Sequence, residues 1–201
     1  ETIHNIVYMG IGEPFDNYEN VMKSIQIINS KQGINIGARK ITISTCGIIP
    51  GIKKLIHNPL QVELSISLHA AENDLRTFLM PVNKKYSLPE LMKVCRQYVK
   101  KKNRQITFEY LMLKGVNDSI NQAKALSSLI SDFDAKVNLI AFNPVKNQNG
   151  LQASDRNAMT GFQEILHKNH IPATVRYSKG QDVQAACGQL RSIYNNLLEY
   201  S

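Results

Sequence analysis

Short β-branched runs recur along this chain, and a turn and a helical pattern follow each of them. This alternation is typical of βα units, in which parallel strands are joined by right-handed crossovers. The predicted strands are His4–Met9, Lys40–Ser44, Val62–Leu68, Gln105–Leu111, Lys136–Phe142 and Ala173–Tyr177. The predicted helices are Tyr18–Ser30, Ile52–His57, Leu88–Lys101, Ser119–Asp132, Ser154–Asn169 and Asp182–Leu198. No linker rich in Pro, Gly or Ser divides these units, so we predict an α/β fold with one domain over residues 1–201.

Polar clusters at the ends of the predicted strands bear on the choice between an open doubly wound sheet and a full or partial (β/α) barrel. In a barrel the carboxyl ends of all strands converge on one mouth, whereas in an open sheet most would lie far from the ligand crevice. Nearly every predicted strand ends in such a cluster, which favours a barrel. The clusters are Gly10–Pro14, Ser44–Cys46, Ser67–His69, Asn143 with Pro144, and Ser178.

The composition excludes the disordered and membrane-spanning classes of protein. Hydrophobic residues make up 43% of the chain and charged residues 20%, which is ordinary for a globular protein. No run approaches the roughly 18 apolar residues of a spanning helix, so we expect a cytoplasmic protein without a membrane partner. Because the chain begins at Glu1, close to the first predicted strand, we also expect that it was cut from a longer protein or processed.

The net charge of +8, from 24 Lys and Arg against 16 Asp and Glu, favours a polyanionic partner such as nucleic acid. The basic runs are most simply solvated faces, which would bind phosphates if they surrounded the barrel mouth. They are Lys53–Lys54, Lys84–Lys85, and Lys100–Lys102 with Arg104.

The turn Met9–Pro14 directly follows a predicted strand. Gly12 lets the backbone approach a ligand closely, and Pro14 biases Glu13 toward an extended conformation that aims its carboxylate into the mouth. A carboxylate fixed there suits an ammonium group. The alternative is a tight turn that carries a surface glutamate.

The next two strands end in hydroxyl-bearing residues, Ser44 with Thr45 and Ser67 before Leu68 and His69. Their hydroxyls suit ribose or carboxylate oxygens, and the alternative is that they cap helices. For His69 a hydrogen-bonding role is favoured over a general base or a metal ligand, because no second histidine lies at ligand spacing.

Asn143 closes a predicted strand, where its amide suits an adenine edge or an amino acid; the alternative is a simple Asn-Pro turn. The three cysteines are too widely spaced for a disulfide framework or a paired-cysteine metal site. Cys95 falls on an amphipathic helical pattern and is predicted to be buried. Cys46 lies at a strand end, where its position allows either a buried or a functional cysteine. Cys187 has small neighbours on both sides that leave its thiol accessible to a bulky substrate, although a lone cysteine is more often a buried hydrophobe.

Seven strings in series resemble the radical S-adenosylmethionine (SAM) methyltransferases that modify adenine in RNA, the family of RlmN and its antibiotic-resistance relative Cfr. The strings occur in the order of the family and span nearly the whole chain. They are Met9–Pro14, Ile43–Pro50, Ser65–Ala70, Leu79–Asn83, Phe108–Tyr110 with Gly115–Asp118, Asn138–Pro144, and Asp182–Leu190.

The resemblance implies a partial (β/α) barrel of the radical SAM type, truncated at its N-terminal side, that binds SAM across its strand ends. Gly12 and Glu13 match the residues that hold the methionine amino group. The cysteine that the family methylates corresponds to Cys187. The other implied cofactor contacts are Ser44, Ser67, Leu68, His69 and Asn143.

The resemblance also implies a radical mechanism with a 4Fe–4S cluster and an electron donor. The C2 carbon of adenine is electron-poor, so it cannot attack a sulfonium methyl group by ordinary displacement. By analogy, one SAM molecule methylates Cys187, and a second is cleaved reductively to a deoxyadenosyl radical. That radical takes hydrogen from the S-methyl group, and the resulting carbon radical adds to adenine. A second cysteine then resolves the protein–RNA link as a disulfide.

This chain departs from the family in one large respect. The Cys-x-x-x-Cys-x-x-Cys cluster loop and the resolving cysteine, which lie upstream of the Gly-Glu-Pro strand in the family, do not occur in it. We therefore expect the chain alone to be inactive and to hold no cluster. The missing first strand would leave an unpaired barrel edge, which favours self-association.

Three strings, Gly12–Pro14, Ser65–Ala70 and Phe108–Tyr110, look closer to the family branch that methylates adenine C2. That branch acts on large-subunit (23S) ribosomal RNA, and some members also act on transfer RNA. Three alternatives stay open: C8 methylation as in Cfr, a non-catalytic basic RNA-binding module, and a radical enzyme that acts on a small molecule.

Overall fold

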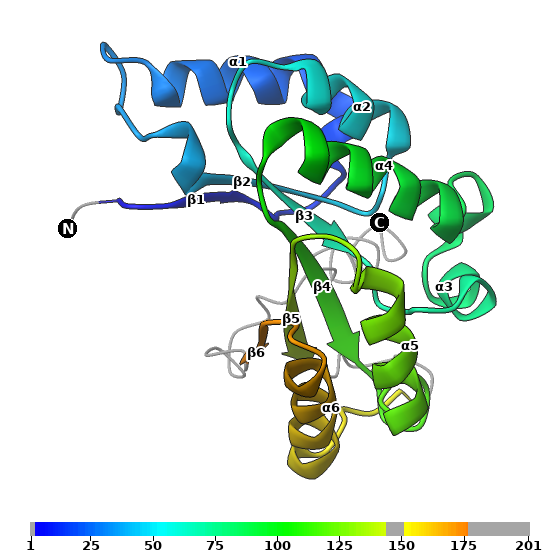
Figure 1. Cartoon of the computed structure of the whole chain (residues 1–201). Coiled ribbons are helices and arrows are strands. Elements are labelled where there is room, and N and C mark those ends of the chain that lie inside the picture. The colour runs from blue at the N-terminus through cyan, green and yellow to red at the C-terminus, as the bar shows by residue number, and fades with distance from the viewer. Residues whose placement is uncertain (1–2, 144–150, 177–201) are drawn as a thin grey trace, which may run out of the picture.

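The computed structural model describes residues 3–143 and 151–176. Within them all strands are parallel and form one sheet whose order, β1 to β6, follows the sequence. The sheet curves into an open arc with the helices on its outer face (Figure 1). This arrangement confirms the predicted partial (β/α) barrel. The strands are β1 (Ile6–Tyr8), β2 (Ile41–Thr45), β3 (Glu63–Ser67), β4 (Ile106–Met112), β5 (Ala135–Ala141) and β6 (Ala173–Arg176).

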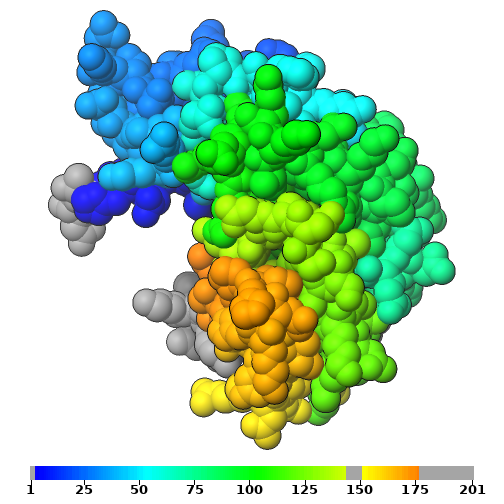
Figure 2. All heavy atoms as spheres, in the orientation of Figure 1, coloured from blue at the N-terminus to red at the C-terminus, as the bar shows by residue number. Residues whose placement is uncertain are grey.

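The helices follow one another along the outside of the arc, from α1 in blue through α4 in green to α6 in orange (Figure 2). They are α1 (Tyr18–Asn29), α2 (Ile49–His57), α3 (Asn73–Leu79), α4 (Leu88–Lys102), α5 (Ile120–Ile130) and α6 (Arg156–Lys168), with 3-10 turns η1 (Pro14–Asn17), η2 (Ala38–Lys40) and η3 (Pro81–Lys84). Helix α2 begins at Ile49 instead of the predicted Ile52, because Pro50 in the first helical turn needs no hydrogen-bonded backbone N–H. Helix α3 was not predicted. The predicted helix Asp182–Leu198 lies outside the described residues, so the prediction of a single domain over 1–201 stays a prediction.

The hydrophobic core lies between the sheet and the helices, and the opposite, concave face of the sheet is polar. In β2, Ile41, Ile43 and Thr45 are buried, while Thr42 and Ser44 are half-buried on the other face. The strand register extends this alternation, because paired residues of parallel strands point to the same side. One row of the concave face is Ser44, Ser65, Thr107 and Lys136, and another is Ser67, Glu109, Asn138 and Thr174.

Lys102 corrects the prediction that the run Lys100–Lys102 is wholly solvated. Its side chain is buried and its Nζ donates to the carbonyl oxygens of Asn58 and Leu60, whereas Lys100 and Lys101 are more exposed. The carbonyls of this loop before β3 need a donor, and the long lysine stem at the end of α4 supplies it. Cys95 is fully buried, as predicted. No helix in the described part of the chain is long and apolar enough to cross a membrane.

Candidate functional site

Glu13 lies in the turn after β1, and two backbone N–H groups fix its carboxylate. The N–H of Cys46 donates to Oε2 at 2.8 Å, and the N–H of Phe15 donates to Oε1 at 3.0 Å. The backbone of Glu13 is extended (φ −111°, ψ 115°), which confirms the conformation predicted from Pro14. A carboxylate has about four lone-pair sites, so each oxygen can still accept a further hydrogen bond from a ligand.

Gly12, directly before Glu13, has φ +95°, a conformation that favours glycine. Among the described residues, no atom outside its immediate chain neighbours lies within 4 Å of the position that a Cβ would take. The backbone beside the Glu13 carboxylate is therefore uncovered by the described part of the chain on this side, and the role of Gly12 in ligand binding stays a prediction.

Ser44 and Ser67 lie on the concave face at the ends of β2 and β3, and both are half-buried. Their hydroxyls make no hydrogen bond to any residue that the structure describes. The pairing of Thr45 with Ile66 puts Cys46 level with Ser67, so the Glu13 carboxylate and the Ser67 hydroxyl are at one height along the strands. Thr45 does not cap α2 either, because the N-cap residue is Ile48, which has no side-chain cap hydrogen bond. The Oγ1 of Thr45 accepts from the N–H groups of Gly47 and Ile48, which precede the helix, at 3.1 and 3.3 Å.

Leu68 and His69 follow Ser67 in a loop whose backbone hydrogen bonds to Glu109 of β4. Leu68 is fully buried, and its backbone N–H donates to the Glu109 carbonyl oxygen at 3.0 Å. His69 has φ +59°, and its Nδ1 accepts from the N–H of Leu111 at 3.1 Å, which assigns the proton of the neutral ring to Nε2. Burial, together with the charge of Arg76, lowers the pKa of His69 to about 4. His69 is thus a neutral ring that hydrogen bonds to β4, and its predicted contact with a cofactor stays a prediction.

Asn143 lies beyond the end of β5 and is half-buried, and its side chain makes no hydrogen bond to a described residue. Cys187 and Ser178 fall outside the described residues, so the predictions for them remain predictions. Cys46 and Cys95 are free thiols, and no group of three or more His, Cys, Asp or Glu in residues 3–143 and 151–176 could hold a metal ion.

Glu109 is a concave-face residue that the sequence reasoning did not single out as a site residue. It is 6% exposed, and its Oε1 accepts from Ser65 Oγ and from Asn138 Nδ2, both at 2.9 Å. In the register Glu109 lies beside Ser67. The available signal was one acidic residue within the otherwise apolar and aromatic strand Ile106–Met112.

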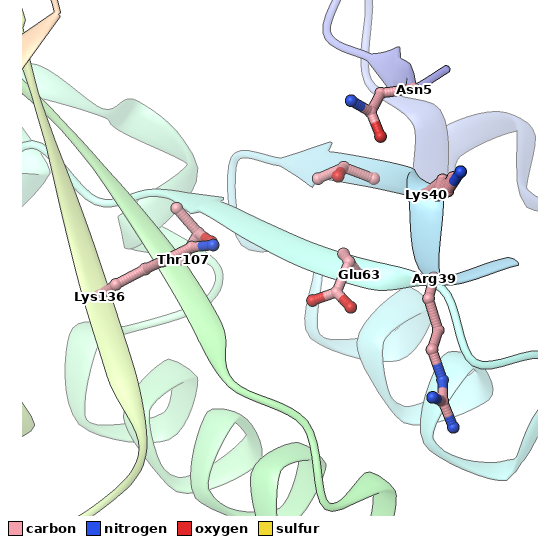
Figure 3. Close-up of a pocket in the computed structure, with 7 residues that line it drawn as sticks. Asn5, Arg39, Lys40, Glu63, Thr107 and Lys136 are labelled. Carbon is pink, nitrogen blue, oxygen red and sulfur yellow. The ribbon is translucent and has the colours of Figure 1, made fainter. Parts of the chain in front are cut away.

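A polar hollow of about 330 Å³ lies at the other end of the sheet, by the amino ends of the strands (Figure 3). Glu63 lies within it and pairs with Arg104. None of the predicted site residues contributes to this hollow, which separates it from the cluster around Glu13. Its lining residues are Asn5, Arg39, Lys40, Thr42, Glu63, Thr107 and Lys136.

The sequence pattern of the Radical SAM superfamily matches residues 2–124, more than half of the chain. The chain belongs to the radical SAM superfamily. Its similarity extends to a probable dual-specificity RNA methyltransferase RlmN from Caldicellulosiruptor saccharolyticus, which is 50% identical over 197 residues, covering 98% of this chain and 57% of the relative.

Solved structures agree with this assignment. A radical SAM methyltransferase from Sphaerobacter thermophilus has a TM-score of 0.91 and 46% identity, with 94% of this chain and 55% of that protein covered. A domain of a pyruvate-formate lyase-activating enzyme from Bacteroides vulgatus has a TM-score of 0.66 at 15% identity, a likeness of fold alone, over 87% of this chain and 99% of that domain. This radical SAM chain spans little more than half the length of the curated relatives that it matches.

Proposed function

We propose that the protein to which this chain belongs is a radical SAM methyltransferase that forms 2-methyladenosine in 23S ribosomal RNA and in transfer RNA, with Cys187 as the methylated cysteine. About half of the aligned residues are identical in proteins named as probable dual-specificity RNA methyltransferases, which supports RNA methylation as the activity. The net charge of +8 suits an RNA partner.

The observation that carries the SAM site is the Glu13 carboxylate, which two backbone N–H groups hold beside open space over Gly12. A carboxylate held there would bind the methionine ammonium by a charge-assisted hydrogen bond. The hydroxyls of Ser44 and Ser67, which bond to no described residue, would bind ribose or carboxylate oxygens. We assign Leu68, His69 and the Asn143 amide to the remaining contacts.

When bound, SAM and a 4Fe–4S cluster would supply the radical chemistry that an electron-poor adenine carbon requires. The three cysteines of this chain do not have the spacing of the cluster loop. We therefore place the cluster ligands and the resolving cysteine in the part of the longer protein outside these 201 residues, and we expect the chain alone to be inactive.

The test is the nucleoside content of RNA from cells that carry only a Cys187→Ala variant of the full-length protein. We expect 2-methyladenosine to disappear from 23S ribosomal RNA and transfer RNA, as measured by mass spectrometry. A matched Cys95→Ala variant, changed in the core, should retain the modification. Persistent 2-methyladenosine in Cys187→Ala would refute the role of this cysteine, and 8-methyladenosine in the wild type would favour the alternative C8 activity.

A further inference from the structure

Arg76 of α3 is a cation buried at the strand ends, with 0% of its surface exposed. Its Nη2 donates to the carbonyl oxygen of Cys46 at 2.8 Å and to that of Ser67 at 3.3 Å, and its Nη1 donates to Asn83 Oδ1 at 2.7 Å. No carboxylate in the described part of the chain forms a salt bridge with it. Arg76 thus ties the end of β2 to the end of β3.

The surroundings of Arg76 are built to hold the guanidinium in this position. The side-chain amide of Asn83 is locked, because its Nδ2 donates to both oxygens of Asn73 and to Thr77 Oγ1 at 2.8–3.1 Å, which turns Oδ1 toward Arg76. Gly47 has φ +109°, and a Cβ on it would lie 3.2 Å from Nη2. The close approach of the guanidinium to the Cys46 carbonyl therefore depends on a glycine at position 47.

A stability role alone explains this arrangement poorly. Burying a charge without an ionic partner costs free energy, and neutral carbonyls offset only part of that cost. An apolar residue of similar volume would fill the same space without it. The peptide groups of Cys46 offer another reason, because its N–H donates to Glu13 while the carbonyl of the same residue accepts from Arg76.

We propose that Arg76 is a positioning residue for SAM: by holding the Cys46 carbonyl it orients the Cys46 N–H, which in turn fixes the Glu13 carboxylate for the methionine ammonium. This inference rests on the proposed function, since it needs Glu13 to bind that ammonium. The stronger of the two Nη2 contacts, to Cys46, acts through Glu13 on the amino-acid end of the ligand, so that end should depend on Arg76 more than the nucleoside end does.

The test compares two ligands of the full-length protein with its cluster reconstituted, S-adenosylhomocysteine and methylthioadenosine, by titration calorimetry. The second ligand lacks the amino-acid group. Arg76→Lys keeps the charge but cannot span the two carbonyls and Asn83, so we expect it to weaken S-adenosylhomocysteine binding about tenfold. Methylthioadenosine binding should change less than about twofold, within the measurement error.

Two further variants link the effect to Glu13 and to the guanidinium. In a Glu13→Gln background Arg76→Lys should cause no further loss, because residues that act in series are not additive. If Arg76→Lys fails to fold, Asn83→Ser is the second variant, because it keeps Arg76 but removes the amide oxygen that holds its Nη1. It should also weaken S-adenosylhomocysteine binding selectively, by a smaller factor than Arg76→Lys. Arg96→Lys, the same change in a surface ion pair with Asp132, is the matched control and should leave both affinities unchanged.

Equal losses for both ligands, or additive losses with Glu13→Gln, would show that Arg76 only maintains the fold and would overturn the inference. Selective loss in Glu13→Gln without any in Arg76→Lys or Asn83→Ser would overturn the inference alone. If Glu13→Gln causes no selective loss, Glu13 does not bind the methionine ammonium. That outcome would refute both the proposed role of Glu13 and that of Arg76.

Discussion

The ring of Phe15 packs directly on Gly51 of α2, where a Cβ would lie 2.4 Å from Cγ and 2.5 Å from Cβ of the phenylalanine. Phe15 is the buried residue of η1, and the N–H of Phe15 is one of the two donors that fix Glu13. The absence of a side chain at position 51 therefore sets how closely the turn carrying the Glu13 carboxylate approaches α2.

Gly51→Ala should displace Phe15 and with it the Glu13 turn. An alanine gains helix propensity over glycine, but the overlap with a buried ring outweighs this gain, so we expect a net loss of about 1–3 kcal/mol in the free energy of unfolding. Urea denaturation of the full-length protein measures it. Gly161→Ala is the matched control in α6, where a Cβ meets nothing within 4 Å, and it should be neutral or stabilising by up to about 1 kcal/mol. Equal effects of the two variants would contradict the packing argument.

Cys46 should be a poor nucleophile in the folded protein. Burial, reinforced by the neighbouring Glu13, raises the pKa of its thiol to about 12, so at pH 8 on the order of one thiol in 10,000 is ionised. We expect iodoacetamide to alkylate Cys46 at least about 100-fold more slowly in the folded protein than in urea, as followed by peptide mass spectrometry. Comparable rates in the two states would show that the thiol is not protected.

Asn138→Asp should destabilise the protein more than Asn138→Ala. The Asn138 amide donates to the buried Glu109 carboxylate, and its loss in Asn138→Ala should cost about 1–3 kcal/mol. An aspartate would add a second carboxylate at the same place, and the two like charges would repel each other. This extra loss is present at neutral pH and should shrink as the pH falls to about 4, where an introduced aspartate takes up a proton. Chemical denaturation at pH 7 and pH 4 compares the two variants, and an extra loss that persists at pH 4 would contradict the charge argument.

His69 should make stability depend on pH in mildly acidic solution. Its pKa is lowered to about 4 in the folded protein from 6.5, so protons bind first to the unfolded chain. The resulting loss in the free energy of unfolding is absent above about pH 6.5 and grows as the pH falls. It is complete near pH 4, where it reaches at most about 3 kcal/mol. His69→Asn keeps an acceptor for the Leu111 N–H and tolerates the positive φ. The variant should lose this part of the profile between pH 6.5 and 4, and an unchanged profile would exclude His69 as its source.

The sheet and much of the candidate site could be predicted from sequence because both follow from local patterns. Strand-length β-branched runs indicate the parallel βα repeat, and parallel strands must bring their carboxyl ends to one edge. Glu13, Ser44 and Ser67 can therefore be grouped from the sequence alone, and the pairing of β2 with β3 and the Glu13–Cys46 hydrogen bond bring their positions together.

Arg76 and Lys102 could not be predicted to be buried, because their partners come from distant segments. Arg76 looks like a surface residue within the polar stretch Glu72–Thr77, and its acceptors lie on β3 and η3 and in the turn after β2. Helix α3 is only seven residues long, too short for an apolar periodicity to stand out. Such buried cations depend on the assembled fold, and no local pattern contains that information.

From β2 onward, each strand of this sheet pairs with the described strand that the ribosome makes just before it. Glu13, Ser44 and Ser67 all precede β4, which ends at Met112. During translation, the edge that carries these three side chains can therefore assemble while Cys187 has not yet been synthesised. The thiol that we assign to the reaction would then be added to a chain in which these ligand-binding residues are already in position.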